Sequence, residues 1–261
     1  GACNCRYGCQ PAAMKKISLA AAVSLLALAP AAATPPPLPP VAEKDAATLQ
    51  AAMTQGSMSD ELLTTLYLDR ITKIDDHGPK LDAVIATFPD AASEAKRLWE
   101  ERKSGKVRGP LHGIPVLIKD NIEAKGPLPT TAGSQALKDN VTNRDAPIVA
   151  RLRKAGAVIL GKTNLSEWAN IRSGDSTSGW SAVGGLTKNP HALNRNACGS
   201  SSGSGAAVAA SLAPLAIGTE TDGSITCPAA INGIVGFKPT VGLVSRTFIV
   251  PISHSQDTAG P

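Results

Sequence analysis

Two serine-containing segments and one lysine carry the residue types that could do covalent chemistry in this sequence. The first segment, Gly199 to Gly205, holds four serines and three glycines in seven positions and runs into an alanine-rich stretch. Such loops occur as flexible linkers, phosphate-binding loops and catalytic loops. A linker is disfavoured because the following AAVAASLA has high helix propensity. A P-loop is disfavoured because Ala206 stands where that motif requires lysine.

A nucleophile elbow is a third interpretation of the same loop. Residues 199–203 satisfy the pattern G-x-S-x-G, which makes Ser201 the candidate nucleophile. That motif follows a strand and precedes an acid and a histidine in the chain. The stretch NPHALNRNAC before the loop is not expected to form a strand, and only His254 follows it. The sequence is therefore a weak match to an elbow.

The second segment places a serine in a tight turn after the apolar stretch LAIG. Backbone N–H groups of the turn residues Thr221, Asp222, Gly223 and Ser224 can point at one place, as an oxyanion hole requires. No histidine lies nearby, but Lys119 ends the apolar run VLI, and a buried, uncharged lysine can act as a base. Taken singly, a lysine at a strand end and a serine in a turn are more often structural, so the catalytic interpretation depends on their combination.

Helix and strand alternate in the elements that must position these residues. The stretch from Asp45 to Lys106 has helical spacing, with Ser59 or Asp60 as a cap for its second helix. Buried strands are predicted at 116–118 and 157–160, with a helix at 146–154 between them. The alternation continues through AAVAASLAPLAIG, which indicates an α/β fold.

Composition allows a globular protein and argues against a nucleic-acid partner. The 261 residues are 43% hydrophobic, enough for one large or two small domains. The net charge is +5, but Arg6, Lys15 and Lys16 fall within the first 33 residues, which contain no acidic residue. The remaining charges are mixed along the chain, without a basic run interleaved with aromatic residues.

The first 44 residues are expected to lie outside the catalytic fold. Residues 14–33 combine two lysines, an apolar run and three alanines, which predicts a signal peptide cleaved before Thr34 and export to the periplasm or the medium. The apolar run is short for a membrane-spanning helix, which needs about 18–20 residues; an uncleaved anchor is the alternative. Residues 1–13, which include three cysteines, are interpreted as an upstream artefact or scar, and residues 34–44 as a proline-rich tether.

Four motifs occur together in residues 45–261: G-I-P-V-x-I-K-D, the Gly-Ser-Ser-Ser-Gly loop, G-S-I-x-x-P-A and G-x-K-P-T-x-G. In this combination the sequence resembles the amidase signature family. Within that family, the motif sequences CGSSSGSG and GTETDGSI-x-CPAAING are similar to those of bacterial peptide amidases. The resemblance implies an α/β fold with a mixed, twisted sheet covered by helices on both sides. Family members are longer, so this chain is expected to be C-terminally truncated and to hold the N-terminal part of that fold.

The resemblance also implies a mechanism. Ser224 matches the nucleophile, Ser200 a bridging serine and Lys119 the base, with the Gly199–Ser200 peptide bond in the cis form. Ser201 matches a supporting position in the loop. The expected reaction is hydrolysis of a carboxamide, with C-terminal peptide amides as one candidate, to a carboxylate and ammonia through an acyl-enzyme. No metal or organic cofactor, nucleic acid, stable membrane anchor or obligate partner protein is expected; the partner is the small-molecule or peptide amide.

Two departures from the broad family pattern bear on the substrate. Thr226 stands where many members have arginine, and Asp222 where many have glycine. Both disfavour the A subunit of a glutamine-hydrolysing amidotransferase, which remains the alternative enzyme. A non-catalytic fragment that kept the motifs is the alternative of another class. The sequence leaves open whether Cys198 and Cys227 pair, because it does not say whether their Cα atoms come within about 7 Å.

Overall fold

The computed structural model describes residues 40–261. The predicted signal peptide, the expected scar at 1–13 and most of the predicted tether lie outside the described residues. The last part of the tether segment packs against the fold: Val41 is fully buried, and its carbonyl accepts a hydrogen bond from the Tyr67 hydroxyl at 3.1 Å. The folded domain therefore includes residues before position 45.

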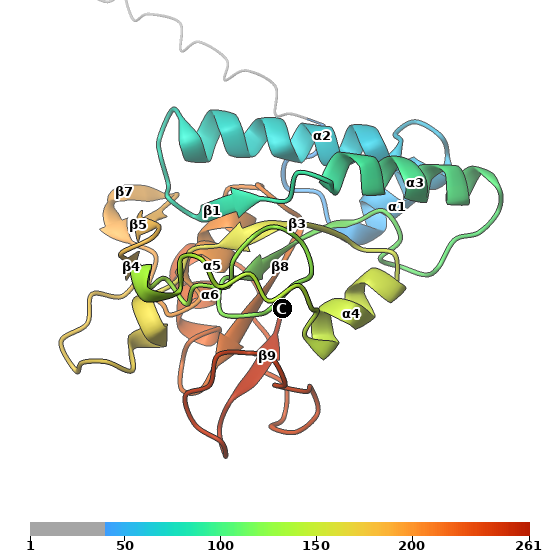
Figure 1. Ribbon diagram of the computed structural model, residues 1–261. Helices are drawn as coiled ribbons and strands as arrows, with labels where there is room; N and C mark the ends of the chain where they lie inside the picture. Colours follow the sequence, from blue (N-terminus) through green and yellow to red (C-terminus); the bar gives the residue numbers. More distant parts are fainter. Residues whose placement is uncertain (1–39) are drawn as a thin grey trace, which may run out of the picture. The chain divides into compact units, whose positions relative to one another are not determined.

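Three parallel strands form the centre of a five-stranded sheet (Figure 1). They are β2 (Pro115–Lys119), β3 (Val158–Thr163) and β8 (Leu215–Glu220), with β2 between the other two. The edge strands are antiparallel: β1 (Val84–Thr87) pairs with β3, and β9 (Thr258–Gly260) pairs with β8. All five residues of β2 are buried, as the apolar run predicted. The mixed sheet confirms the predicted α/β class.

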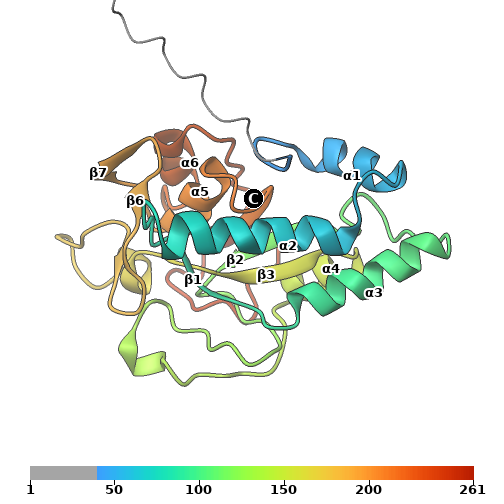
Figure 2. The same ribbon diagram turned by 90° about the horizontal axis from the view of Figure 1, so that it is seen from above.

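Helices cover both faces of this sheet (Figures 1 and 2). Helix α4 (Pro147–Lys154) connects β2 to β3, and α5 (Ser202–Ala209) connects β3 to β8 on the far side of β2. The two crossovers run in opposite directions along the sheet, so right-handed connections place α4 and α5 on opposite faces. Arg70 of α2 donates to the carbonyls of Ala210 and Ser211 at 2.7 Å, which joins α2 to the end of α5.

The N-terminal stretch is not helical throughout, contrary to the prediction for residues 45–106. It contains α1 (Ala46–Thr54), α2 (Asp60–Arg70) with a π-helical turn (Ile71–Asp76), strand β1, and α3 (Ala91–Lys103). The Ser59 hydroxyl caps α2 by accepting from the Leu62 amide, which confirms one of the two predicted caps. Strand β1 was not predicted, because its four residues are all half-buried and show no alternation of apolar and polar positions.

The segment before the serine loop also differs from its prediction. Residues within NPHALNRNAC form β7 (Ala192–Asn196), which pairs with β6 (Lys188–Asn189) in a two-stranded hairpin outside the main sheet. The strand has no apolar alternation because four of its five residues are exposed. The remaining short elements are 3₁₀ turns at Gln135–Leu137 and Glu167–Asn170, the hairpin β4 (Trp180–Ser181) and β5 (Gly185–Leu186), and α6 (Thr226–Asn232).

A buried ion pair fixes α2 against α3. Arg102 contacts both carboxylate oxygens of Asp60, with Nε at 3.0 Å and Nη2 at 3.1 Å, and donates to the His112 carbonyl at 2.8 Å. The Asp60 side chain is 0% exposed and that of Arg102 is 7% exposed. Removing one partner of such a pair leaves the other charge buried and unpaired.

Arg102→Met should therefore lower the free energy of unfolding by about 3–5 kcal/mol, because the buried Asp60 carboxylate loses its counter-ion. Lys103→Met is the matched control: Lys103 pairs with Glu100 at the surface, where an ion pair contributes about 0–1 kcal/mol. Urea denaturation followed by circular dichroism measures both. Equal, small effects of the two substitutions would contradict the assigned role of the buried pair.

Candidate active site

Lys119, at the carboxyl end of β2, contacts two hydroxyl groups, one on the serine loop and one on β8. The Lys119 side chain is fully buried, and its Nζ lies 2.7 Å from Ser200 Oγ and 2.8 Å from Thr219 Oγ1. It also lies 3.3 Å from the Thr219 carbonyl oxygen. No carboxylate is bonded directly to the amine, so its hydrogen-bond partners among the described residues are neutral.

Burial lowers the pKa of Lys119 to about 7, because the interior disfavours the charged ammonium. The negative charges of Glu220 and Asp257 oppose this shift by favouring the ammonium, but they are the smaller influence. An amine with a pKa near 7 is largely uncharged in mildly alkaline solution and can accept a proton from a hydroxyl group.

The serine loop enters this site with the Gly199–Ser200 peptide bond in the cis form, as the resemblance implied. The Ser200 carbonyl accepts a hydrogen bond from the Ser166 amide at 3.0 Å. Gly199 packs so tightly that a Cβ added there would lie 2.3 Å from Ser166 Oγ. The loop backbone is therefore held by Ser166 while its Ser200 side chain contacts Lys119, and a larger residue at position 199 would require the Ser166 hydroxyl to move.

Ser201 joins the loop to β8 and to the second serine. Its hydroxyl lies 3.2 Å from the Thr219 amide and 3.1 Å from the Thr219 carbonyl, donating to the latter, and its own amide donates to the Ser224 carbonyl at 3.0 Å. Ser201 therefore has a full set of structural contacts. The elbow interpretation, in which Ser201 is the nucleophile, also lacks its histidine here: His254 lies on an exposed loop.

The turn from Thr221 to Ser224 follows β8, as predicted from the LAIG stretch. The Glu220 carboxylate holds it from inside, accepting from the amides of Ile225 at 2.7 Å and Thr226 at 2.9 Å. These bonds, together with one from the Gly223 amide, outweigh desolvation and keep the pKa of Glu220 below its ordinary value. Within residues 40–261, the Asp222 amide and the Ser224 hydroxyl have no hydrogen-bond partner. Ser224 itself is 8% exposed.

A disulfide joins the two serine-containing segments. Cys198 and Cys227 are bonded, with their Cα atoms 6.1 Å apart and a sequence separation of 29. Cys198 directly precedes the cis peptide bond, and Cys227 lies in the first turn of α6. The pairing that the sequence left open is therefore present, and it ties the loop of Ser200 to the helix that follows Ser224.

Sequence reasoning missed two polar residues that contact the buried amine directly or through one neighbour. Thr219 bonds to Lys119, and Asn121 Nδ2 donates to Thr219 Oγ1 at 3.0 Å. A signal was present: Thr219 ends the apolar strand LAIG as Lys119 ends VLI, and two parallel neighbouring strands bring their carboxyl ends together. The register that makes them face each other is not readable from the sequence.

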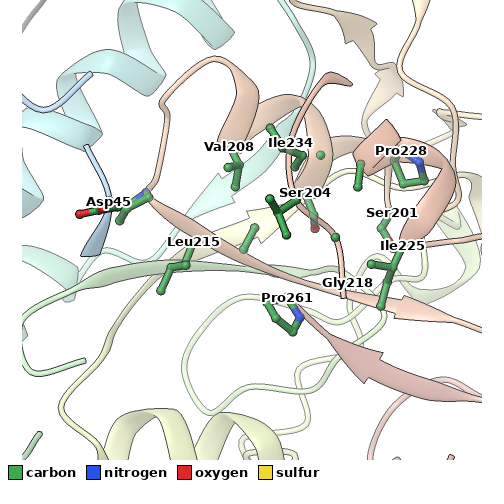
Figure 3. A pocket seen from close by; sticks show the side chains of 16 residues that line it. Asp45, Ser201, Ser204, Val208, Leu215, Gly218, Ile225, Pro228, Ile234 and Pro261 are labelled. Carbon is green, nitrogen blue, oxygen red and sulfur yellow. The ribbon is translucent and has the colours of Figure 1, made fainter. Parts of the chain in front are cut away.

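A cavity of about 330 Å³ lies behind the serine loop, between α5, α6 and β8 (Figure 3). Ser201, Gly218 and Ile225 line one end of it, and most of the lining is apolar. Lys119, Ser200 and Ser224 do not line it. It is therefore distinct from the place where Lys119 contacts Ser200.

Comparison with known proteins settles the family. The Amidase family profile matches residues 62–261, which is most of the chain. The chain belongs to the amidase family. A native peptide amidase from Stenotrophomonas maltophilia superposes with a TM-score of 0.82 at 62% sequence identity, covering 84% of this chain and 45% of that one. An amidase family protein from Bacillus anthracis gives 0.81 at 44% identity over 84% of this chain and 44% of that one.

Curated sequences include both amidases and amidotransferase components. A "Probable amidase" of Arabidopsis thaliana is 50% identical over 215 residues, which is 82% of this chain and 41% of that protein. The A subunit of the glutamyl-tRNA(Gln) amidotransferase of Symbiobacterium thermophilum is 45% identical over 218 residues, which is 83% of this chain and 43% of that protein. The chain thus spans less than half the length of these relatives.

Residues 40–261 lack two features that would bear on binding: a helix able to span a membrane and a cluster of metal ligands. Among the described residues, no helix combines the length and apolar character needed to cross a bilayer. No group of three or more His, Cys, Asp or Glu side chains in residues 40–261 is arranged to hold a metal ion. The polar groups of the site are hydroxyls, backbone amides and carbonyls, the Asn121 amide, the Glu220 carboxylate and one amine.

The depressed pKa of Lys119 predicts a pH-dependent stability. The folded-state pKa of about 7 lies below the ordinary value of 10.5, so between these pH values the unfolded chain binds a proton that the folded chain does not. Stability then rises with pH across this window. The free energy of unfolding of the wild type, relative to Lys119→Met, should increase from pH 7 to pH 10 by an amount on the order of a few kcal/mol.

Lys96→Met, at an exposed position on α3, is the matched control. Its difference from the wild type should stay nearly constant over the same range. Urea titrations at four pH values measure both differences. A Lys119→Met difference that is also independent of pH would contradict the depressed pKa.

Proposed function

We propose that this chain carries the catalytic centre of an amidase that hydrolyses a carboxamide to a carboxylate and ammonia through an acyl-enzyme on Ser224. The observation that carries the proposal is the 2.7 Å contact between Ser200 Oγ and the fully buried Lys119 Nζ. A buried amine beside a hydroxyl is what proton removal from a serine requires. Membership of the amidase family supports the same reaction.

The first half-reaction forms the acyl-enzyme. Uncharged Lys119 takes the proton of Ser200 Oγ, which takes the proton of Ser224 Oγ as that oxygen attacks the amide carbon. The carbonyl oxygen becomes an oxyanion, which backbone amides of the turn from Thr221 to Ser224 stabilise. When this intermediate collapses, the carbon–nitrogen bond breaks. Ser200 returns its proton to the nitrogen, Lys119 reprotonates Ser200, and ammonia leaves.

The second half-reaction reverses the proton path with water in place of Ser224. Water gives a proton to Ser200, which passes one to Lys119, while the hydroxide oxygen bonds to the acyl carbon. The bond between that carbon and Ser224 Oγ breaks, and the proton returns through Ser200 to Ser224. The products are a carboxylic acid, which ionises, and the free enzyme. Ser201 and Gly199 support this relay by holding the loop backbone.

The substrate we propose is a C-terminal peptide amide. Two facts support this class: the 62% identity to a solved peptide amidase, and the presence of Thr226 where an arginine would carry a positive charge beside the nucleophile. The similarity to amidotransferase A subunits keeps glutamine as the competing substrate. The two candidates separate in a direct comparison of substrates.

We also propose that the protein is exported. Residues 14–33 have the pattern of a signal peptide, and the Cys198–Cys227 disulfide suits an oxidising compartment. Expression of the full chain in a Gram-negative bacterium, followed by mass spectrometry of the periplasmic product, tests this. A product beginning at Thr34 is expected, and an unprocessed chain confined to the cytoplasm would contradict export.

The intact chain should release ammonia from a blocked dipeptide amide faster than from free glutamine. Ser224→Ala and Lys119→Ala should each reduce this release by about 10³-fold or more, because one removes the nucleophile and the other its base. Ser104→Ala and Lys106→Ala change the same residue types at exposed positions and should leave the rate unchanged. A coupled glutamate dehydrogenase assay measures ammonia.

Three results would overturn parts of this proposal. Release of ammonia at the wild-type rate by both Ser224→Ala and Lys119→Ala would contradict the proposed relay. Preference for glutamine would favour the amidotransferase-like activity. A folded chain that releases no ammonia from either substrate and is not labelled at Ser224 by a fluorophosphonate would favour a non-catalytic fragment.

A further inference from the structure

A strap formed by residues 246–257 connects the two strand ends that carry the site. At its start, the Val250 amide donates to the Asn121 carbonyl at 2.9 Å, and the Phe248 carbonyl accepts from the Glu123 amide at 3.0 Å. Asn121 and Glu123 follow closely after Lys119. The first part of the strap is therefore fixed to the chain that leaves β2.

Asp257 fixes the other end of the strap to the turn of the nucleophile. Its Oδ1 accepts from the Thr221 hydroxyl at 2.6 Å and from the Ser253 amide at 3.0 Å. Its Oδ2 accepts from the Ile252 amide at 2.8 Å. The next residue, Thr258, begins β9 and pairs with Glu220 of β8. One carboxylate thus closes the strap on itself and holds the first residue of the turn.

Asp257 also acts on Lys119 through its charge. The charged groups near Lys119 are the carboxylates of Glu220 on β8 and Asp257 on the strap, the buried pair of Asp120 and Lys162, and Arg246 on the strap. Arg246 lines one small cavity with Thr219, Glu220 and Asp257. The negative charge of Asp257 favours the ammonium form and so raises the pKa of Lys119. Asp257 is therefore coupled to both the base and the turn.

We propose that Asp257 is a positioning residue for amide hydrolysis: it holds the turn from Thr221 to Ser224 in register with Lys119 by binding the Thr221 hydroxyl. This role rests on the proposed function of Ser224 and Lys119. Asp257 touches neither the reacting atoms nor the three residues of the relay. It acts through Thr221, whose backbone belongs to the oxyanion turn, and through the strap that is fixed behind Lys119.

The test compares Asp257→Asn, Thr221→Val and the double variant in the intact chain. The rate at which a fluorophosphonate labels Ser224 is measured by mass spectrometry between pH 5 and 9. Its plateau at high pH, where Lys119 is uncharged, should fall about tenfold in each single variant. Both substitutions remove the same hydrogen bond, between the Thr221 hydroxyl and Asp257. The double variant should therefore be labelled no more slowly than the slower single variant. Asp175→Asn removes an exposed carboxylate and should label at the wild-type rate.

The pH profile separates positioning from a purely structural role. Labelling needs uncharged Lys119, so its rate rises with pH through the pKa of that amine. Asp257→Asn removes a charge that raises this pKa, so the midpoint of the rise should move to lower pH. Thr221→Val keeps the charge and should leave the midpoint in place. Independent, multiplying effects of the two variants, or a wild-type rate and midpoint in Asp257→Asn, would overturn the proposal.

Hydrogen exchange keeps the positioning role separate from the proposed chemistry. The peptide covering residues 219–227 should exchange faster in Asp257→Asn and in Thr221→Val than in Asp175→Asn, because the turn loses its attachment to the strap. If wild-type Ser224 is not labelled, the proposed function fails, and this exchange still decides the structural claim. Unchanged exchange in both variants would overturn it.

Discussion

The arrangement depends on one constraint, the burial of an amine at the carboxyl end of the central strand. Lys119 ends β2, which lies between β3 and β8, and its side chain is fully buried. Charging it there requires solvation that the interior does not supply, so the surroundings favour the uncharged form. Its contacts among the described residues are hydroxyls and a carbonyl, which tolerate a neutral amine. A lysine in this state can accept a serine proton, which an exposed lysine near neutral pH does not do.

The fold brings segments that are remote in sequence to this amine. Ser200 is 81 residues from Lys119 in sequence, and Thr219 is 100 residues away. Both reach it because parallel strands with right-handed crossovers gather their carboxyl ends at one edge. The disulfide between Cys198 and Cys227 and the hydrogen bonds of Ser201 then attach the two serine segments to each other. One covalent bond and several hydrogen bonds together hold the two segments in this geometry.

Sequence reasoning succeeded where a local pattern dictates the structure. The apolar run before Lys119 predicted a fully buried strand, and β2 is one. It failed where tertiary pairing decides: β1 was taken for helix, because four half-buried residues gain their strand form from pairing with β3. β7 was missed for a similar reason, since its residues are mostly exposed and a hairpin partner orders them. The contact of Lys119 with Thr219 depends on sheet register, which motif spacing does not encode.

Burial should lower the pKa of the Lys119 amine from its ordinary value to near neutrality, and a direct titration of this amine is the sharpest test. Lysines labelled with ¹³C at Cε give one resonance each, and the Lys119 signal is identified by its loss in Lys119→Met. We expect this resonance to titrate with a midpoint near pH 7, because burial lowers the pKa of Lys119 to about 7. A Lys119 resonance that titrates near pH 10, with the other lysines, would contradict it.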